Sequence, residues 1–293
     1  MGTRCAVGAA TLPLLLLAGC SLFPSTRKLP VPKAPAVVQT VTPEELVKQL
    51  DDRWDAVNSF TATVEIQATE LKSKEGVEKA FPSCRGYIVM QKPKMLRVAG
   101  TYFGAKIFDM ASDGKTFTLV IPPKGLVFDG SNSVKGTSPN PLYNLRPDFF
   151  FDALLVHSVP PGDFYSRISD TETVEDAAKK HLLITPEYIL NVTRHNDGSH
   201  SDTPIRVITV HRDDLLPYQQ DLYDDNGNLE TEVFYSRYAD FGGNKYPSQV
   251  TIKRPIEGIQ LVLTVERVVD NPKLTDDQFT VKIPDGAKIE QLK

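Results

Sequence analysis

Apolar residues near the start of the folded region recur at every third or fourth position, which is the spacing of one face of a helix. Thr42 precedes Pro43 and two glutamates, a combination typical of an N-cap, a proline in the first turn and acids near the positive end of the helix. The pattern predicts one amphipathic helix over residues 43–57. Its apolar face carries Leu46, Leu50, Trp54 and Val57.

After this helix, apolar residues recur at every second position instead of every third or fourth. In SFTATVEIQAT, residues 59–69, small and apolar side chains alternate with Thr, Glu and Gln, which is typical of a half-buried antiparallel strand. Similar segments follow, separated by breaks rich in Gly, Pro, Asp and Asn. The expected strands of the first half are 59–69, 86–91, 94–102, 105–112, 115–121 and 125–128. Those of the second half are 181–186, 187–195, 204–213, 217–225, 228–241, 245–255 and 259–270.

Between the two strand series, RPDFFFDALLVH at residues 146–157 has the apolar density of a buried helix. Asp225-Asn226-Gly227-Asn228 predicts a tight hairpin with a primed turn, and Gly242-Gly243-Asn244 predicts another hairpin. No repeat of fixed period and no second linker interrupt the pattern. The chain is therefore expected to form one mainly β domain of the α+β class, built on a meandering antiparallel sheet with few helices.

The N-terminal residues differ from the rest. Arg4 is followed by the short apolar run AVGAATLPLLLLA, which is typical of a secretory signal and too short to span a bilayer. The run ends in Leu-Ala-Gly-Cys, which resembles the bacterial lipobox and implies that Cys20 is acylated and begins the mature protein. We expect a lipoprotein signal peptide at 1–19, a lipidated Cys20 with a proline-rich linker at 20–42, and a folded domain at 43–293.

Composition excludes some classes of function but does not identify one. The chain of 293 residues has a formal charge of −4, and loss of residues 1–19 removes only Arg4, which gives −5. No basic stripe is present, so nucleic acid is not an expected partner. Because Cys5 leaves with the signal and Cys20 takes lipid, Cys84 has no partner for an internal disulfide and is expected to be a buried, inert thiol.

No sequence motif for nucleophilic, metal-dependent or nucleotide chemistry is present, so we expect no enzyme, no cofactor and no metal site. HNDGSH places His195, Asp197 and His200 close together, but Asn, Gly and Ser between two strands favour a solvated loop over a metal site. Asp224 and Asp225 lack the ligand spacing of a calcium loop.

Four segments in order carry a family resemblance. LVKQLDDRWDAVNSFTATVEIQAT, VMQKPKMLRV, ASDGKTFTLVIPP and DDQFTVKIPDGAKIEQLK together resemble the LolA/LolB family of periplasmic lipoprotein carrier and outer-membrane lipoprotein receptor. The resemblance implies a curved antiparallel sheet that forms a half-open β-barrel, with its concave face covered by a few helices. It also implies an apolar cavity for the acyl chains of another lipoprotein. The soluble carrier has no acyl anchor, so Cys20 places this chain nearer the receptor.

Alternation along the strands identifies side chains that would line this cavity, with the helix from Phe149 to Val156 as its lid. The same side chains could instead form a filled core, since periodicity shows only which face is apolar. Where the carrier has an arginine that holds its lid closed, this chain has Lys92, which lacks the guanidinium fork. The candidate lining residues are Val64, Ile66, Ile88, Met90, Leu96, Val98, Phe117, Leu119, Phe149, Leu154, Leu261 and Leu263.

The loop VAGTYFGAKI, residues 98–107, corresponds to a membrane-contacting loop of the resembling receptor. Its aromatic pair Tyr102 and Phe103 would sit at a hairpin tip, where polar residues are usual. Exposed aromatic rings suit a membrane interface. The alternative is that both rings fold back onto the core of the domain.

The expected function is uptake of acyl chains from acylated lipoproteins or lipids and their transfer or insertion at the outer membrane, with a periplasmic carrier protein as a further partner. The expected location is the bacterial cell envelope, lipid-anchored and facing the periplasm. Ser21 in place of an aspartate favours the outer over the inner membrane. The alternative is an envelope sensor or regulatory lipoprotein that uses the same fold to bind a partner protein or lipid signal.

Overall fold

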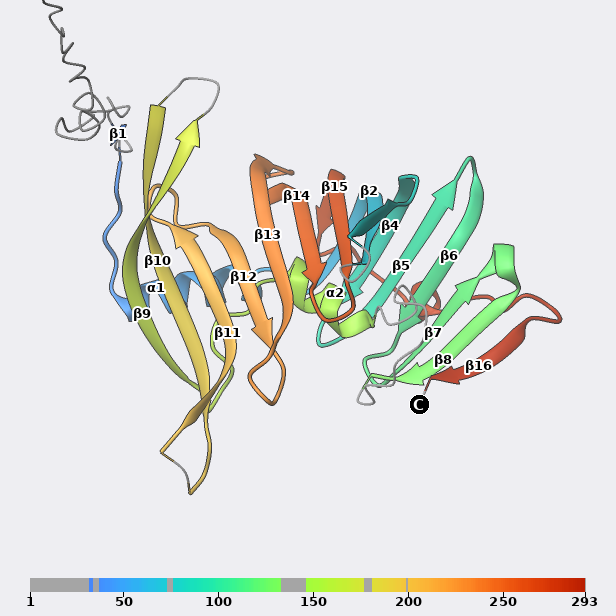
Figure 1. The fold of residues 1–293 in the computed structure, drawn as a ribbon. Coiled ribbons are helices and arrows are strands. Elements are labelled where there is room, and N and C mark those ends of the chain that lie inside the picture. Colours follow the sequence, from blue (N-terminus) through green and yellow to red (C-terminus); the bar gives the residue numbers. More distant parts are fainter. Residues whose placement is uncertain are drawn as a thin grey trace, which may run out of the picture.

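The computed structural model describes residues 32–33, 37–72, 76–132, 146–176, 181–198 and 200–292. Within these residues the strands belong to one large sheet, shown in Figure 1. The helices are α1 (Pro43–Asp55) and α2 (Pro147–Leu154), with short 3-10 turns η1 (Pro122–Lys124) and η3 (Asp276–Phe279). The first strands are β1 (Pro32–Lys33), β2 (Ser59–Lys72), β3 (Val77–Ala80), β4 (Cys84–Gln91), β5 (Met95–Tyr102), β6 (Ala105–Ser112), β7 (Thr116–Ile121) and β8 (Leu126–Ser131). The others are β9 (Phe164–Asp176), β10 (His181–His195), β11 (Asp202–His211), β12 (Pro217–Tyr223), β13 (Leu229–Asp240), β14 (Lys245–Arg254), β15 (Ile259–Asp270) and β16 (Lys288–Leu292).

The sheet consists of two antiparallel meanders joined side by side. One runs from β10 to β15 in chain order, and the other runs from β2 through β4 to β8. They meet where β15 pairs antiparallel with β2, from Asp270 opposite Phe60 to Ile259 opposite Glu70. In the described residues the sheet does not close on itself, because β9 ends it beside β10 and β16 ends it beside β8. The predicted mainly β fold with a curved, half-open sheet is confirmed.

Bulges and a glycine pair help the sheet to bend. The pairing register shifts between Val265 and Arg267 on β15 and between Gly100 and Thr101 on β5, and such bulges increase local twist. Gly86 lies directly opposite Gly100 across β4 and β5. A Cβ on Gly86 would lie 2.5 Å from the Ile66 side chain and 2.8 Å from that of Val64, so a larger residue there would force these side chains to shift.

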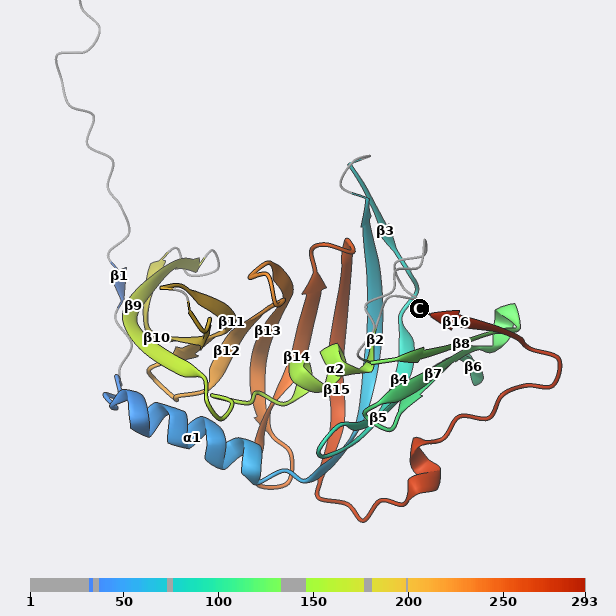
Figure 2. The same ribbon diagram turned by 90° about the horizontal axis from the view of Figure 1, so that it is seen from below.

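The two helices cover different parts of the sheet on the side seen in Figure 2. Leu46 and Leu50 of α1 pack in a cluster with Tyr188, Leu190 and Ile208 of β10 and β11. The larger core cluster joins α2 to the inward side chains of β2, β4 to β8 and β13 to β15. Val156, just after α2, contacts both clusters, so the segment that follows α2 connects them.

The first helix forms as predicted and ends at Asp55. Thr42 is its N-cap and forms a reciprocal capping box with Glu45. The contacts of the domain begin earlier in the chain: the Gln39 amide donates to the Arg212 carbonyl at 2.7 Å, and β1 pairs in parallel with β10. The end of the proline-rich linker therefore lies against the sheet.

Several elements differ from the predictions. Residues 181–195 form one strand, β10, where two were expected, and α2 ends at Leu154 because Leu155 is extended. Strands β1, β3, β9 and β16 were not predicted. These strands lie at sheet margins or are short, so burial imposes no clear alternation of apolar and polar residues on them.

The β12–β13 connection is not the predicted primed turn. A type I′ turn needs a positive φ at both central residues, but in this turn only Gly227 has one, at +76°. The Asp224 carboxylate instead accepts from the amides of Asn226 and Asn228 at 2.9 and 2.8 Å. The side chain of Asp224 thus closes a wider loop, as Asx turns do. The hairpin at residues 242–244 forms as expected between β13 and β14.

Candidate functional site

A cavity of about 260 Å³ lies where the C-terminal half of α1, the end of α2 and strands β13 and β14 meet. Most of its wall is apolar, and charged residues stand among those that line it. An apolar concavity between helices and a sheet is typical of ligand sites. Its lining residues are Leu50, Asp52, Arg53, Trp54, Ala56, Val57, Phe60, Leu154, Leu155, Val156, Pro217, Tyr235, Tyr238, Asn244, Lys245, Tyr246, Pro247 and Asp270.

Trp54, near the end of α1, is held from several sides. The Lys92 ammonium lies 4.0 Å from the centre of the indole ring and donates to the Trp54 carbonyl. The ring of His157 meets the indole edge-on at 4.6 Å, and Phe151 does so at 6.1 Å. Lys92 therefore binds the end of α1 through a single ammonium, both at the Trp54 carbonyl and over the indole ring.

Strands β12, β13 and β14 each bind one carbonyl at the end of α2. Gln220 Nε2 donates to the Asp152 carbonyl at 2.9 Å, Tyr235 Oη to the Ala153 carbonyl at 2.8 Å, and Tyr246 Oη to the Leu154 carbonyl at 2.9 Å. The last carbonyls of a helix have no partner inside the helix. These side chains supply the missing donors and fix the end of α2 beside the cavity.

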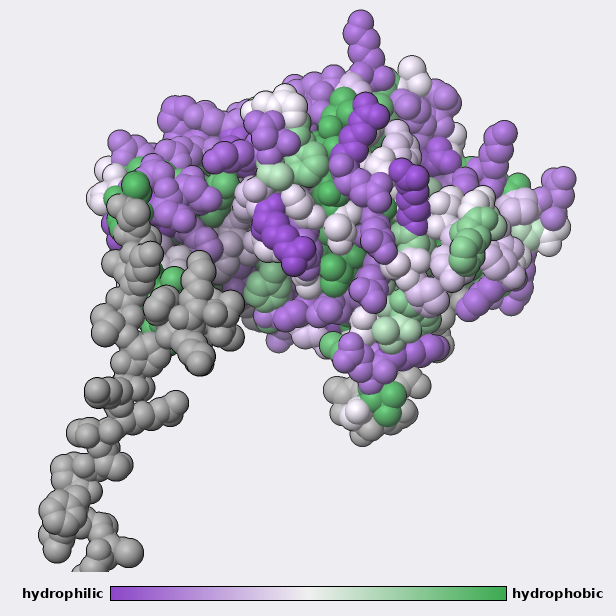
Figure 3. Space-filling model, turned by 90° about the horizontal axis from the view of Figure 1, so that it is seen from above, coloured by the Kyte–Doolittle hydropathy of each residue, from purple (hydrophilic) through white to green (hydrophobic). Residues whose placement is uncertain are grey.

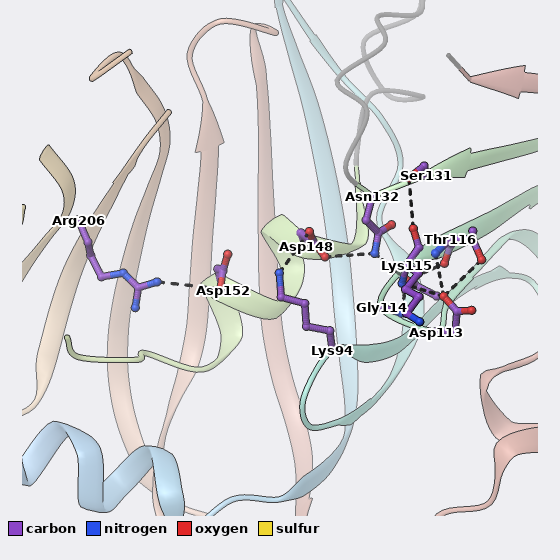
Figure 4. Close-up of polar contacts among 11 residues, drawn as sticks. Lys94, Asp113, Gly114, Lys115, Thr116, Ser131, Asn132, Asp148, Asp152 and Arg206 are labelled. Atoms are coloured by element: carbon purple, nitrogen blue, oxygen red, sulfur yellow. Dashed lines mark hydrogen bonds and ion pairs between the residues drawn. The ribbon is translucent and has the colours of Figure 1, made fainter. Parts of the chain in front are cut away.

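Ion pairs hold the rest of α2, as Figure 4 shows. At its start, the Asp148 carboxylate lies 3.6 Å from Lys94 Nζ and accepts from Asn132 Nδ2 at 3.2 Å. Further along, the Asp152 carboxylate lies 4.0 Å from the buried guanidinium of Arg206 on β11. Polar contacts thus tie α2 to both meanders, one at each end of the helix.

Burial shifts the pKa of several groups in and near the cavity wall. Burial raises the pKa of Tyr235, Tyr238 and Tyr246 above the usual range of a phenol. Burial also lowers the pKa of Lys92, and burial followed by the nearby Arg206 charge lowers that of His157. Each of these groups is therefore driven towards its neutral form, which is what a low-dielectric environment does.

The predicted cavity residues all lie in the core. Every one of the twelve is buried and belongs to the larger core cluster, beneath or within α2. Of them, only Leu154 lines the cavity. The remaining eleven pack against one another on the concave side, so acyl-chain binding by these side chains remains a prediction. Tyr235, Tyr238 and Tyr246 were not predicted as site residues, although Tyr235 shares its strand face with the apolar Val233.

The aromatic pair of the β5–β6 hairpin lies outside the core. Phe103 is 93% exposed and Tyr102 is 42% exposed. Their rings contact each other edge-on at 4.5 Å, and Phe103 has a φ of +47°. This left-handed conformation is uncommon for a bulky residue. The two rings thus do not fold back onto the domain.

The face of the molecule opposite to that in Figure 2 is shown in Figure 3. This surface is largely hydrophilic and carries separate apolar patches.

The other candidate residues fall into three groups. Cys20 lies outside the described residues. Cys84 is buried and free, and burial raises the pKa of its thiol, as expected for an inert cysteine. His195 sits beside the β10–β11 turn, where its Nδ1 lies 2.9 Å from Asp202. Across the part of the chain that the structure describes, no group of three or more His, Cys, Asp or Glu could hold a metal ion.

Neither α1 nor α2 is both long and apolar enough to cross a bilayer, and no other described helix is.

Comparisons with known proteins support the fold. No protein-family profile matches the sequence, and no curated protein is detectably similar to it. Among solved structures, a DUF1329 family protein from Desulfovibrio piger has 19% identity and a TM-score of 0.51, and the match covers 80% of this chain and 95% of that one. A LolA superfamily protein from Nitrosomonas europaea has 15% identity and a TM-score of 0.50, over 83% of this chain and 99% of that one. The chain has the fold of these proteins.

Proposed function

We propose that this chain, which shares its fold with a LolA superfamily protein, binds an acyl chain of a lipoprotein or lipid in the cavity between α1, α2 and β13–β14. The observation that carries this proposal is the apolar cavity itself. The ends of both helices line it, and Trp54, Phe60 and Leu154 contribute to its apolar surface. Burial of methylenes from the ligand, at ~0.8 kcal/mol each, would supply the affinity without covalent chemistry. We propose a carrier rather than an enzyme.

The size of the cavity sets how much of a ligand it holds. A methylene takes up about as much space as a liquid water, on the order of 30 Å³, so a cavity of about 260 Å³ holds only part of a long acyl chain. Leu154 belongs both to the cavity wall and to the core under α2. A shift of α2 would therefore extend the cavity beneath the helix, towards the candidate residues of the concave side.

Membrane attachment completes the proposal. Acylation of Cys20 would tether the domain to the periplasmic face of the outer membrane, and Tyr102 and Phe103 would contact the bilayer while the ligand leaves. The exposure of both rings supports this role. The ligands would be acylated lipoproteins or lipids, delivered by a periplasmic carrier.

The test is uptake of a fluorescent fatty acid, measured by titration. Val57→Trp places a larger side chain in the cavity wall and is expected to weaken binding by about tenfold or more, because a tenfold change needs only about 1.4 kcal/mol of lost burial. The matched control is Val47→Trp, at a half-buried valine of α1 that packs against the other cluster. It should bind like wild type.

Two results would overturn the proposal. One is uptake by wild type no greater than by an unrelated protein. The other is equal binding by Val57→Trp and wild type, which would place the ligand elsewhere.

A further inference from the structure

Strand β9 lies at one margin of the sheet, as Figures 1 and 2 show. Its 13 residues pair with β10 along their whole length, from Phe164 opposite Thr193 to Asp176 opposite His181, and the register does not shift. In the described part of the chain no strand pairs with its other side. A long, regular edge of this kind is a ready template for another strand.

Proteins usually protect such edges with charged side chains, above all lysine, with proline or bulges, or by keeping the strand short. β9 contains neither lysine nor proline. Its one arginine, Arg167, points towards the domain, where it lies 4.3 Å from the Tyr188 ring and donates to the Val41 carbonyl. At the other margin β16 is only five residues long. The β9 edge is thus the longer of the two, and the charges along it are acidic rather than basic.

The pairing with β10 shows which backbone groups of β9 face outward. Pro186 lies opposite Thr171, and its carbonyl accepts from the Arg212 amide at 3.0 Å, on the side away from β9. In an antiparallel ladder, residues that are not hydrogen-bonded to each other direct their N–H and C=O groups away from each other. Thr171 therefore faces the open edge, and so do Ser169 and Thr173 by alternation. The Thr171 amide is bound at 2.7 Å by the adjacent Asp170 carboxylate, not by β10.

The side chains along this edge divide into an apolar and an acidic part. Phe164 and Ile168 share one face of β9 and are 58% and 51% exposed. Asp170 and Glu172 continue the same face and are also exposed. From Asp170 to Asp176 the sequence has four acids and no lysine or arginine.

We propose that the β9 edge binds an extended peptide segment of a partner protein by antiparallel strand addition. Antiparallel pairing is slightly more stable than parallel pairing and is the rule in the long ladders of this sheet. Main-chain hydrogen bonds supply affinity in such complexes and alternate side chains supply specificity. Basic residues of the peptide lie opposite Glu172 and Asp170, and apolar residues lie opposite Ile168 and Phe164. Read from its N-terminus, the partner motif is basic-x-basic-x-apolar-x-polar-x-apolar.

The test uses the full chain and the labelled peptide Lys-Thr-Lys-Thr-Val-Thr-Thr-Thr-Val, with binding measured by fluorescence anisotropy. Ser169→Pro removes one outward amide and leaves the β9–β10 ladder intact, since proline is tolerated on the solvent side of an edge strand. It is expected to weaken binding by about tenfold or more. The matched control Ser169→Ala keeps the amide and should bind like wild type.

Charge reversal tests the acidic part. The double variant Asp170→Lys and Glu172→Lys should lose the basic peptide and gain a version of it with glutamate in place of lysine. Equal binding by Ser169→Pro and Ser169→Ala, or no binding by wild type, would overturn the proposal. A wild-type dimer that Ser169→Pro abolishes in sedimentation would also overturn it, because the edge would then bind a second copy. Fatty-acid uptake is unaffected in every case, so this outcome is separate from that of the proposed function.

Discussion

At the scale of single residues, Trp54 shows how the cavity wall depends on side chains distant in sequence. Its indole meets the Lys92 ammonium from the β4–β5 turn and the His157 ring from the segment after α2. The guanidinium of Arg206 donates to the His157 carbonyl, and Ser158 donates to Asp51 of α1. The charged groups of Lys92 and Arg206 therefore lie near the His157 imidazole, which packs against the Trp54 indole. Protonation of the imidazole would add a third positive charge there and is disfavoured.

The first prediction concerns the pH dependence that follows. Burial and Arg206 lower the pKa of His157, and the carboxylates of Asp51 and Asp152 only partly oppose them. In the unfolded chain a histidine titrates near pH 6.5. Below that pH the unfolded state binds more protons than the folded state, so stability is full above about pH 6.5 and is lost as the pH falls towards the folded pKa. Urea unfolding at pH 7.5 and 5.5 measures the difference.

The matched variant is His157→Gln, which keeps a polar side chain but does not titrate. It should show a smaller loss of stability between the two pH values than wild type. An unchanged loss would assign the pH dependence to other groups.

At the scale of elements, the β5–β6 hairpin is unusual because its exposed tip carries two aromatic rings, one of them on a residue with positive φ. Residues held in rare backbone conformations often have a functional reason. The second prediction is that replacing Tyr102 and Phe103 by serine changes stability by no more than about 0.5 kcal/mol, as is usual for exposed positions. Delivery of bound fatty acid to liposomes should fall, while binding itself is kept.

The control for this variant is Ile256→Ser, at another exposed hairpin tip between β14 and β15, where Ile256 is 66% exposed. Delivery by this control should match wild type. A loss of several kcal/mol in the double variant, the scale expected for truncated core aromatics, would contradict the exposed placement. Equal delivery by the double variant and the control would contradict a membrane role.

The sequence predicted elements best where burial imposes a period. α1 and the central strands were found because one face of each packs into a core. β9 was missed because its exposed face mixes Phe164 and Ile168 with acids, which gives no alternation to read. Alternation along the strands likewise predicted that the concave side is apolar. It could not predict where on that side a cavity is left between the side chains. The cavity depends on how helix ends and Tyr235 and Tyr246 pack, and no single-strand pattern encodes that.

At the scale of the whole molecule, the proposed lipid anchor and the folded domain occupy separate parts of the sequence. The buried core residues of the described domain run from Leu46 to Phe279, and all of them follow the proline-rich linker in the sequence. The third prediction is that Cys20→Ala yields a folded protein that fractionates as soluble or as an uncleaved precursor. Cell fractionation and circular dichroism measure the two properties. The matched control is Cys84→Ala, which should stay with the membrane, because Cys84 is buried in the domain. If the Cys20 variant remained acylated and membrane-bound, the lipobox interpretation would be wrong.

The pairing of β2 with β15 has a consequence for how this chain reaches its fold. β2 is among the first strands to be synthesised, whereas the strand that covers one of its edges is the last of the second meander. Contacts so distant in sequence form slowly, since a long loop must close before they contribute. Until β15 arrives, the edge of β2 offers unpaired backbone groups beside Phe60, Val64 and Ile66, which invites aggregation. In a newly made chain this edge of β2 is therefore expected to stay unpaired for longer than the edges within the local hairpins.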